Sequence, residues 1–159
     1  MSINECLDYS PQMDIVQGFV DLGDERRSNL VASQVLVFMI RGATKKWKQI
    51  IGYFLTKNSL SWHTLNHLLH SGLRFCNEAG LKVIAIVCDQ ETSQVRLWRE
   101  LGISPTRPFI IDPAHGHKIS IIPDPPHLLK NLRNNLMKYD IQVCMTSGFP
   151  SYYAVGSPA

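Results

Sequence analysis

The sequence predicts an α/β protein in which helices pack on a mixed sheet. Three observations lead to this class. Two apolar runs at residues 35–40 and 49–55 are spaced like a hairpin, an amphipathic stretch follows at 61–79, and a short apolar run at 82–88 ends at Asp89. A helix that joins a hairpin to a further parallel strand forms a natural right-handed crossover.

The chain length and composition are those of one globular domain. The 159 residues are long enough for a single sizeable core, and 45% of them are hydrophobic while 18% are charged. This composition excludes an intrinsically disordered chain. A net charge of +3 is compatible with nucleic-acid contact but does not indicate it by itself.

The cysteine pattern and the N-terminus favour a soluble intracellular protein. Cys6, Cys76, Cys88 and Cys144 form no CxxC pair, so neither a zinc cluster nor a disulfide framework is expected. The N-terminus carries acidic residues and does not resemble a signal peptide. Because the longest apolar runs are too short to cross a bilayer, no membrane partner is expected.

The first third of the chain predicts three strands. The run at 15–20 reads as one strand that ends at Asp21, and a polar loop is expected at 24–29. The runs at 35–40 and 49–55 are expected to pair, since the linker at 41–48 suits an extended hairpin turn.

A long amphipathic helix follows the hairpin. Ser61 can cap its N-terminus and Gly80 can end it near residue 79. The apolar stripe of this helix comprises Leu65, Leu68, Leu69, Gly72 or Leu73, Cys76 and Ala79.

The run at 82–88 is predicted to be a strand buried on both faces, which places Asp89 at its carboxyl end. Open α/β sheets bind their ligands at this edge, and a rigid carboxylate there could hold a divalent metal ion. An Asp at a strand end can equally cap the following turn. Further acids that could complete a metal site are Asp21, Glu91, Asp112 and Asp124. Of these only Asp21 is also expected at a strand end, and Asp124 is better explained as a helix N-cap.

The second half predicts two helices and two more strands. A helix is expected at 93–101 with Thr92 or Ser93 as its cap, then strands at 109–111 and 118–122. Asp124 is expected to cap a third helix that runs to about Tyr139, since proline suits a first turn. The apolar face of this helix comprises Leu128, Leu129, Leu132, Leu136 and Tyr139. Residues 140–159 lack periodicity and are rich in turn-forming residues, so a disordered tail is predicted.

The histidines are predicted to be exposed or structural. His63, His67 and His70 lie opposite the leucine stripe and read as a solvated face, because no acid or thiol completes a metal shell there. His115 and His117 are expected to be exposed in a glycine-containing loop. For His127, in the first turn of the third helix, a capping role is preferred over a role in a neighbouring site.

Two basic groups could contact a phosphate backbone. Lys45, Lys46 and Lys48 flank Trp47 in the hairpin turn, where the indole could instead pack at the sheet rim. The second group, on the third predicted helix, comprises Lys130, Arg133 and Lys138. Glycines form neither a GxxxxGK[ST] nor a GxGxxG pattern, so no nucleotide-binding loop is predicted.

Five blocks, in their order along the chain, resemble the ribonuclease H-like catalytic region of P-element-type transposases, including the THAP-domain transposase-like proteins. They lie at residues 18–23, 37–42, 52–55, 87–90 and 124–136. The last block, which begins Asp-Pro-Pro-His, is long and specific. The resemblance covers residues 1–139, which are expected to form a partial ribonuclease H-like domain.

The resemblance implies a DNA strand cleavage and joining enzyme that uses an acidic triad and Mg²⁺ or Mn²⁺. Asp89 matches the family's second catalytic Asp, in the Cys-Asp-Gln block. The first Asp belongs to an Asp-Glu-Met motif whose end resembles Met1, so this acid is expected upstream and the first strand is expected to be incomplete. In the family the third acid, a Glu, lies beyond a GTP-binding insertion. This sequence departs from the family pattern near Asp140, so neither the insertion nor this Glu is expected in it. The THAP-type zinc finger is not matched either.

The expected function is therefore that of a transposase fragment that retains one of three acids and is inactive alone. The alternative is a non-catalytic module that binds nucleic acid or protein partners, or self-associates. A longer, active protein of which this sequence is a part is a third reading. By the resemblance, DNA binding should be weak and non-specific, and the protein should be nuclear.

Overall fold

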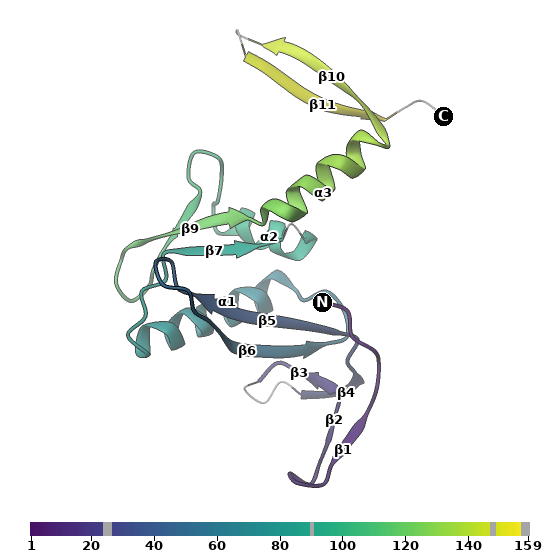
Figure 1. The fold of residues 1–159 in the computed structure, drawn as a ribbon, viewed down its shortest axis with the longest axis vertical. Coiled ribbons are helices and arrows are strands. Elements are labelled where there is room, and N and C mark those ends of the chain that lie inside the picture. Colours follow the sequence, from purple (N-terminus) through teal and green to yellow (C-terminus); the bar gives the residue numbers. More distant parts are fainter. Residues whose placement is uncertain (24–26, 90, 147–148, 157–159) are drawn as a thin grey trace. The chain divides into compact units, whose positions relative to one another are not determined.

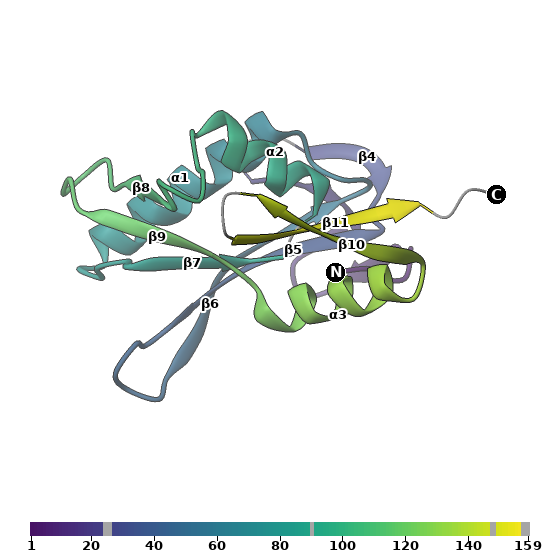
Figure 2. The same cartoon turned by 90° about the horizontal axis from the view of Figure 1, so that it is seen from above.

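The computed structural model describes residues 1–23, 27–89, 91–146 and 149–156, with side chains described up to residue 138. The chain divides into two compact units, Met1–Val83 and Ile84–Ala159. Figure 1 labels the elements of both units except β8, which is labelled in Figure 2. The single domain over residues 1–139 thus stays a prediction. The α/β class is confirmed, since sheets and three helices make up the fold.

The first unit contains an antiparallel sheet, a short ribbon and one helix. The sheet has the order β4-β3-β6-β5, and β1 pairs with β2 in the ribbon. The elements are β1 (Asp8–Ser10), β2 (Ile15–Gln17), β3 (Phe19–Asp21), β4 (Arg27–Val31), β5 (Gln34–Arg41), β6 (Lys48–Thr56) and α1 (Trp62–Glu78).

The predicted hairpin is confirmed. Strands β5 and β6 pair antiparallel from Gln34 opposite Thr56 to Arg41 opposite Lys48, with a register shift after Phe38. Residues 1–3 lie along the start of β5, because the Ile3 N–H donates to the Ser33 carbonyl and the Val35 N–H to the Met1 carbonyl, each at 2.9 Å. The start of the chain is therefore hydrogen-bonded to the first unit's sheet.

The single strand predicted at 15–20 was wrong, because Gly18 divides it. Gly18 has a φ of +103°, and a Cβ at this position would lie 2.1 Å from the carbonyl oxygen of Cys6. A positive φ and a close backbone approach both require glycine. The chain consequently leaves the β1–β2 ribbon at Gly18 and enters the larger sheet as β3.

The polar loop predicted at 24–29 was also wrong in part. Arg27–Val31 forms β4, which pairs with β3, while residues 24–26 lie outside the described residues. The pairing of Asp21 with Arg27 is reinforced by an ion pair of 2.9 Å between their side chains. Backbone pairing to β3 therefore outweighs the polar composition of this segment.

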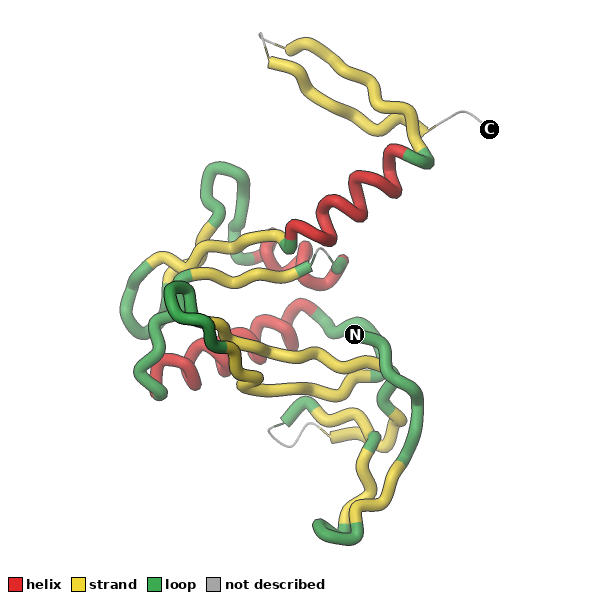
Figure 3. The backbone as a smooth tube through the Cα atoms, viewed as in Figure 1, coloured by secondary structure: helices red, strands yellow, loops and turns green. Residues whose placement is uncertain are grey.

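Helix α1 agrees closely with its prediction. The Thr64 N–H donates to Oγ of Ser61 at 3.2 Å, and Gly80 follows the helix with a φ of +72°. The helix packs on the hairpin through Gly72, where a Cβ would lie 3.2 Å from the Phe38 ring. Figure 3 shows this helix beside the two long strands. Its buried side chains are Leu65, Leu68, Leu73 and Cys76.

The second unit is built on a three-stranded sheet with the order β7-β9-β8. Strand β9 lies in the middle, parallel to β7 and antiparallel to β8. The bounds are β7 (Ala85–Cys88), α2 (Thr92–Glu100), β8 (Phe109–Ile111), β9 (Lys118–Pro123), α3 (Pro125–Leu136), β10 (Tyr139–Thr146) and β11 (Phe149–Gly156). Figure 2 shows β7 and β9 running side by side.

The core of the second unit lies on one face of this sheet. Ile119 and Ile121 of β9 and Ile110 of β8 are buried, and Leu97 of α2 is 1% exposed. Val87 of β7 is 59% exposed, so the prediction that this strand is buried on both faces was wrong. The reason is that successive side chains of a strand point to opposite faces of the sheet, and the unit's core covers only one of these faces.

Both helices of the second unit begin or end differently from their predictions. Helix α2 has Glu91, not Thr92 or Ser93, at its N-cap position, although Gly102 follows its end with a φ of +70°. Helix α3 ends at Leu136, and Tyr139 belongs to β10. Lys138 therefore lies beyond the helix that was expected to carry it. The leucines of α3 are more exposed than those of a helix face packed in a core: Leu128 38%, Leu129 67%, Leu132 53% and Leu136 53%.

The disordered tail predicted from residue 140 is replaced by a β-hairpin. Strands β10 and β11 pair antiparallel, from Tyr139 opposite Gly156 to Thr146 opposite Phe149. In the described part of the chain, no helix combines the length and the apolar character that crossing a membrane requires.

Candidate carboxylate and metal-ligating sites

Asp89 lies immediately after β7, at the carboxyl end of a strand as predicted. Its side chain is half-buried, and its Oδ1 accepts a hydrogen bond from the Glu91 N–H at 3.2 Å. This bond closes the turn that leads into α2, so the turn-capping interpretation of Asp89 is confirmed. The second carboxylate oxygen, Oδ2, is a further acceptor that a cation could use.

The structure brings Asp124 next to Asp89. Cys88 is the register partner of Pro123 in the parallel pair β7–β9, so Asp89 and Asp124 are the next residues on adjacent strands. The Asp124 N–H donates to the Cys88 carbonyl at 2.8 Å, which fixes the two strand ends together. Two carboxylates therefore leave neighbouring strands at the same sheet edge, the usual location of ligand sites in α/β folds.

Asp124 occupies the predicted N-cap position of α3, but its side chain makes no capping hydrogen bond to the backbone of the helix. Its Oδ2 interacts with Nδ1 of His127 in the first turn of the helix, and the Leu128 N–H instead donates to the Asp124 carbonyl at 3.0 Å. The capping role predicted for these two side chains was therefore wrong in detail. His127 is directed toward the carboxylate edge, which is the reading that the sequence had ranked second.

The thiol of Cys88, the last residue of β7, is affected by both carboxylates. Burial raises the pKa of Cys88 first, a hydrogen bond with Trp98 lowers it, and the negative charges of Asp89 and Asp124 raise it further. A raised pKa keeps this thiol protonated at neutral pH. Cys88 is thus a small buried side chain, as predicted, and it lies within the field of both acids.

Asp21, the other strand-end acid, belongs to the first unit. Its Oδ1 accepts from the Gly23 N–H at 2.9 Å, and its Oδ2 pairs with Arg27. Both oxygens are thus engaged in holding β3, β4 and the turn between them. This geometry gives Asp21 a structural role in the described residues.

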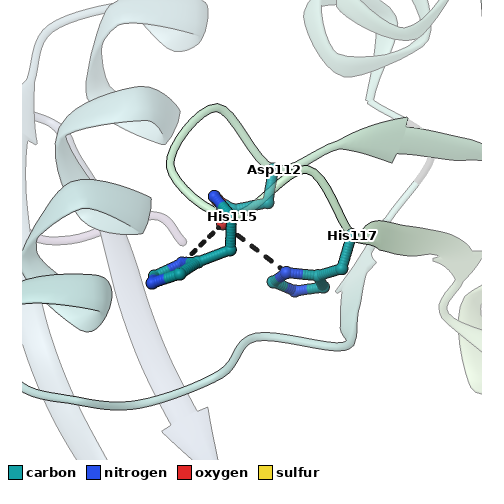
Figure 4. Close-up of side chains that lie close together, drawn as sticks. All are labelled: Asp112, His115 and His117. Carbon is teal, nitrogen blue, oxygen red and sulfur yellow. Dashed lines mark hydrogen bonds and ion pairs between the residues drawn. The ribbon is translucent and has the colours of Figure 1, made fainter.

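Asp112 forms a separate cluster with two histidines in the loop between β8 and β9 (Figure 4). The Asp112 side chain is 1% exposed, and its Oδ2 lies 3.0 Å from Nδ1 of His115 and 3.6 Å from Nδ1 of His117. The His117 side chain is only 17% exposed, so its predicted exposure was wrong, whereas His115 is 61% exposed. Spacing alone could have drawn attention to this Asp-x-x-His-x-His pattern.

The histidines of α1 form the predicted outer face in most respects. His63 and His67 are exposed and His70 is half-buried. The His63 ring stacks on Trp62 with ring centroids 3.6 Å apart. These three residues do not form one of the candidate metal clusters in the described part of the chain.

The first basic group lies in the β5–β6 turn. Lys45, Lys46 and Lys48 are exposed. A Cβ on Gly42 would lie 2.4 Å from Nε1 of Trp47, so the indole folds back over the glycine at the sheet rim. The rim-packing interpretation of Trp47 is confirmed. The three exposed lysines are accessible to a polyanion such as DNA.

The second basic group is on and after α3. Lys130 and Arg133 are exposed on the helix, and Lys138 is exposed two residues beyond its end. Two nitrogens of Arg133 donate to Oδ1 of Asn134, at 3.3 Å from Nε and 3.0 Å from Nη2. The remaining guanidinium N–H groups can still point to a phosphate.

Comparison with known proteins places these features in a family. Residues 1–102 match the family model described as TNP-like, RNase H N-terminal domain. The chain is 38% identical over 102 residues to the Transposable element P transposase of Drosophila melanogaster, a match that covers 64% of this chain and 13% of that protein.

A solved structure gives a longer match. The chain is similar to the Drosophila P element transposase strand transfer complex with a TM-score of 0.70 and 29% sequence identity. That similarity covers 94% of this chain and 30% of the solved chain. The chain thus spans less than a third of the length of these relatives.

Proposed function

The chain belongs to the TNP-like RNase H N-terminal domain family, and we propose that it contributes part of the catalytic region of a P-element-type DNA transposase. The observation that carries the proposal is the position of Asp89, which follows the edge strand β7 at the carboxyl end of the parallel pair β7–β9. Asp89 is also the residue that matches a catalytic acid of the family.

Asp89 and Asp124 are the residues that would hold a divalent cation. Both directly follow adjacent parallel strands at one edge of the sheet, and both charges raise the pKa of the Cys88 thiol. Carboxylate oxygens are the ligands that Mg²⁺ and Mn²⁺ prefer. Such an ion activates water and stabilises the negative charge of a phosphodiester under attack. His127, paired with Asp124, would orient that carboxylate.

DNA is the proposed partner, and the nucleus the proposed location. The exposed lysines of the β5–β6 turn and the exposed basic side chains of α3 supply positive charge without an obvious base-reading element. The named relative acts as a transposase, and its solved structure is a strand transfer complex. Contacts of this chain to DNA should therefore be made mainly to the phosphate backbone.

The 159-residue chain assayed alone is expected not to nick DNA. Two-metal catalysis needs carboxylates on both sides of the reacting phosphate, and only Asp89 matches an acid of the family's triad. The measurement is conversion of supercoiled plasmid to open circles in Mg²⁺ or Mn²⁺, with Asp89→Asn as the paired variant. Nicking by the unaltered chain that disappears in Asp89→Asn would contradict this expectation. Asp124, which follows the adjacent strand β9, would be the next ligand to replace.

DNA affinity is expected to be weak, independent of sequence and strongly reduced by salt. A basic side chain that contacts a phosphate releases a counterion from the DNA. Each contact therefore makes the slope of log affinity against log salt concentration steeper by about one. Replacing Lys130 and Arg133 together with alanine should weaken binding about two- to tenfold, equally for two duplexes of unrelated sequence. Fluorescence anisotropy at several salt concentrations measures this.

The matched control for the double variant is Lys82→Ala, which removes an exposed charge outside both basic groups. This control should leave the affinity within about twofold of the unaltered chain. A strong preference for one duplex that persists at physiological salt would contradict the proposal that the chain contacts mainly the DNA phosphate backbone. It would indicate a surface that reads bases.

A further inference from the structure

The loop between β8 and β9 is tightly organised around Asp112. The Asp112 N–H donates to the His117 carbonyl at 2.8 Å, and the Gly116 N–H donates to the Asp112 carbonyl at 2.9 Å. Gly116 has a φ of +67°, which lets the backbone reverse within six residues before Lys118 pairs with Ile111. The loop therefore has one defined shape that fixes where its side chains point.

Three potential metal ligands converge inside this loop, as Figure 4 shows. Oδ2 of Asp112 lies 3.0 Å from Nδ1 of His115 and 3.6 Å from Nδ1 of His117. One ligand atom from each of the three residues lies within 4.8 Å of the others. Two imidazole nitrogens thus face the same carboxylate oxygen from different positions of the loop.

The spacing of these atoms suits a small metal ion. Ligands at about 2.0–2.1 Å from a tetrahedral zinc ion lie about 3.3 Å from one another. The two distances from Oδ2 of Asp112, 3.0 and 3.6 Å, bracket that value. The carboxylate oxygen therefore lies at a suitable distance from each imidazole, and the three ligand atoms together lie within 4.8 Å of one another.

The burial of Asp112 supports the same conclusion. A carboxylate that is 1% exposed needs hydrogen bonds or positive charge to offset the cost of desolvation. The His115 N–H already donates to Oδ2 of Asp112 at 3.0 Å, which orients this carboxylate from the backbone. Metal-binding carboxylates commonly receive such a supporting hydrogen bond.

We propose that Asp112, His115 and His117 form a site for a divalent transition-metal ion of the zinc type, with its remaining position open to water. Two imidazoles and one carboxylate are borderline ligands that favour Zn²⁺ or Co²⁺ over Mg²⁺. The site would tie the end of β8 to the start of β9 and stabilise the loop.

This site is distinct from the carboxylates at the other end of β9. His117 directly precedes Lys118, the first residue of β9, whereas Asp124 follows Pro123, the last. A strand of six residues spans roughly 20 Å. The metal proposed here therefore does not replace the cation that Asp89 and Asp124 would hold.

The test is titration of the full 159-residue chain with Zn²⁺ by calorimetry and with Co²⁺ by visible absorption. One ion per chain is expected, with a Co²⁺ spectrum of low coordination number. His115→Ala should weaken binding about tenfold to a hundredfold or more, since loss of even an outer partner of a ligand costs that much. Excess Mg²⁺ should not displace the ion.

Matched variants make the result decisive. His63→Ala removes an exposed histidine of α1 and should leave the affinity unchanged. His117→Ala should weaken binding as His115→Ala does, and circular dichroism checks that each variant is folded. Absence of binding at micromolar Zn²⁺, or equal binding by His115→Ala, would overturn the proposal and leave Asp112 as an organiser of the turn alone. Loss of binding in His63→Ala would overturn it too, by locating the ion on α1.

Discussion

Replacing Ile119 with alanine is expected to lower the free energy of unfolding of the second unit by about 2–5 kcal/mol. Ile119 is 0% exposed and lies on β9, the middle strand of the β7-β9-β8 sheet. Removing its side chain leaves a cavity next to the buried side chains of this small core. Because folded domains are stable by only about 5–15 kcal/mol, the loss should be visible as a large shift in the unfolding transition.

Chemical denaturation followed by circular dichroism measures this loss, and the same strand provides the control. Ile122 is 42% exposed on the opposite face of β9. Ile122→Ala should therefore cost less than about 1 kcal/mol. Equal effects of the two substitutions would show that β9 does not have the inward and outward faces described here.

Local patterns predicted the long elements of this fold well. Helix α1 has a side-chain cap at Ser61, a continuous leucine stripe and a glycine stop, and these agree with one another. The β5–β6 hairpin is similarly specified by two apolar runs and a short connection. Elements whose local signals agree need little help from distant parts of the chain.

The short strands β8 and β9 were predicted at or within one residue of their bounds. Three other features could not be predicted, because pairing and close backbone contact, not composition, form them. The polar β4 is a strand only through its partner β3. The break at Gly18 depends on the carbonyl of Cys6, which lies 12 residues earlier in the chain. Strands β10 and β11 pair over eight residue pairs, although the composition of this segment favours turns.

The candidate site was predictable only in part for the same reason. Asp89 could be identified because a strand and its terminal acid are adjacent in sequence. Asp124 looked like an ordinary helix cap until the parallel pairing of β7 with β9 placed it beside Asp89. The Asp-x-x-His-x-His spacing could have drawn attention to the Asp112 cluster, but only the shape of the loop shows that the three side chains meet.

Removal of the Asp89 carboxylate is expected to abolish divalent-cation binding at the β7–β9 edge. The unaltered chain should bind Mn²⁺ there with an affinity on the order of millimolar, because few carboxylates contribute. Asp89→Asn keeps the shape and Oδ1 acceptor of the turn but removes the negative charge, so its affinity should fall at least about tenfold. Asp8→Asn, at an exposed acid of β1, is the matched control.

Mn²⁺ titration followed by NMR line broadening tests the central claim most directly. The account predicts that backbone signals of Val87, Cys88, Asp89 and Leu128 broaden in the unaltered chain and in Asp8→Asn, and stay sharp in Asp89→Asn. Broadening around residues 112–117 would be a separate effect, which His115→Ala removes. Signals at the β7–β9 edge that broaden equally with and without the Asp89 carboxylate would contradict the assignment of Asp89 as a metal-holding acid.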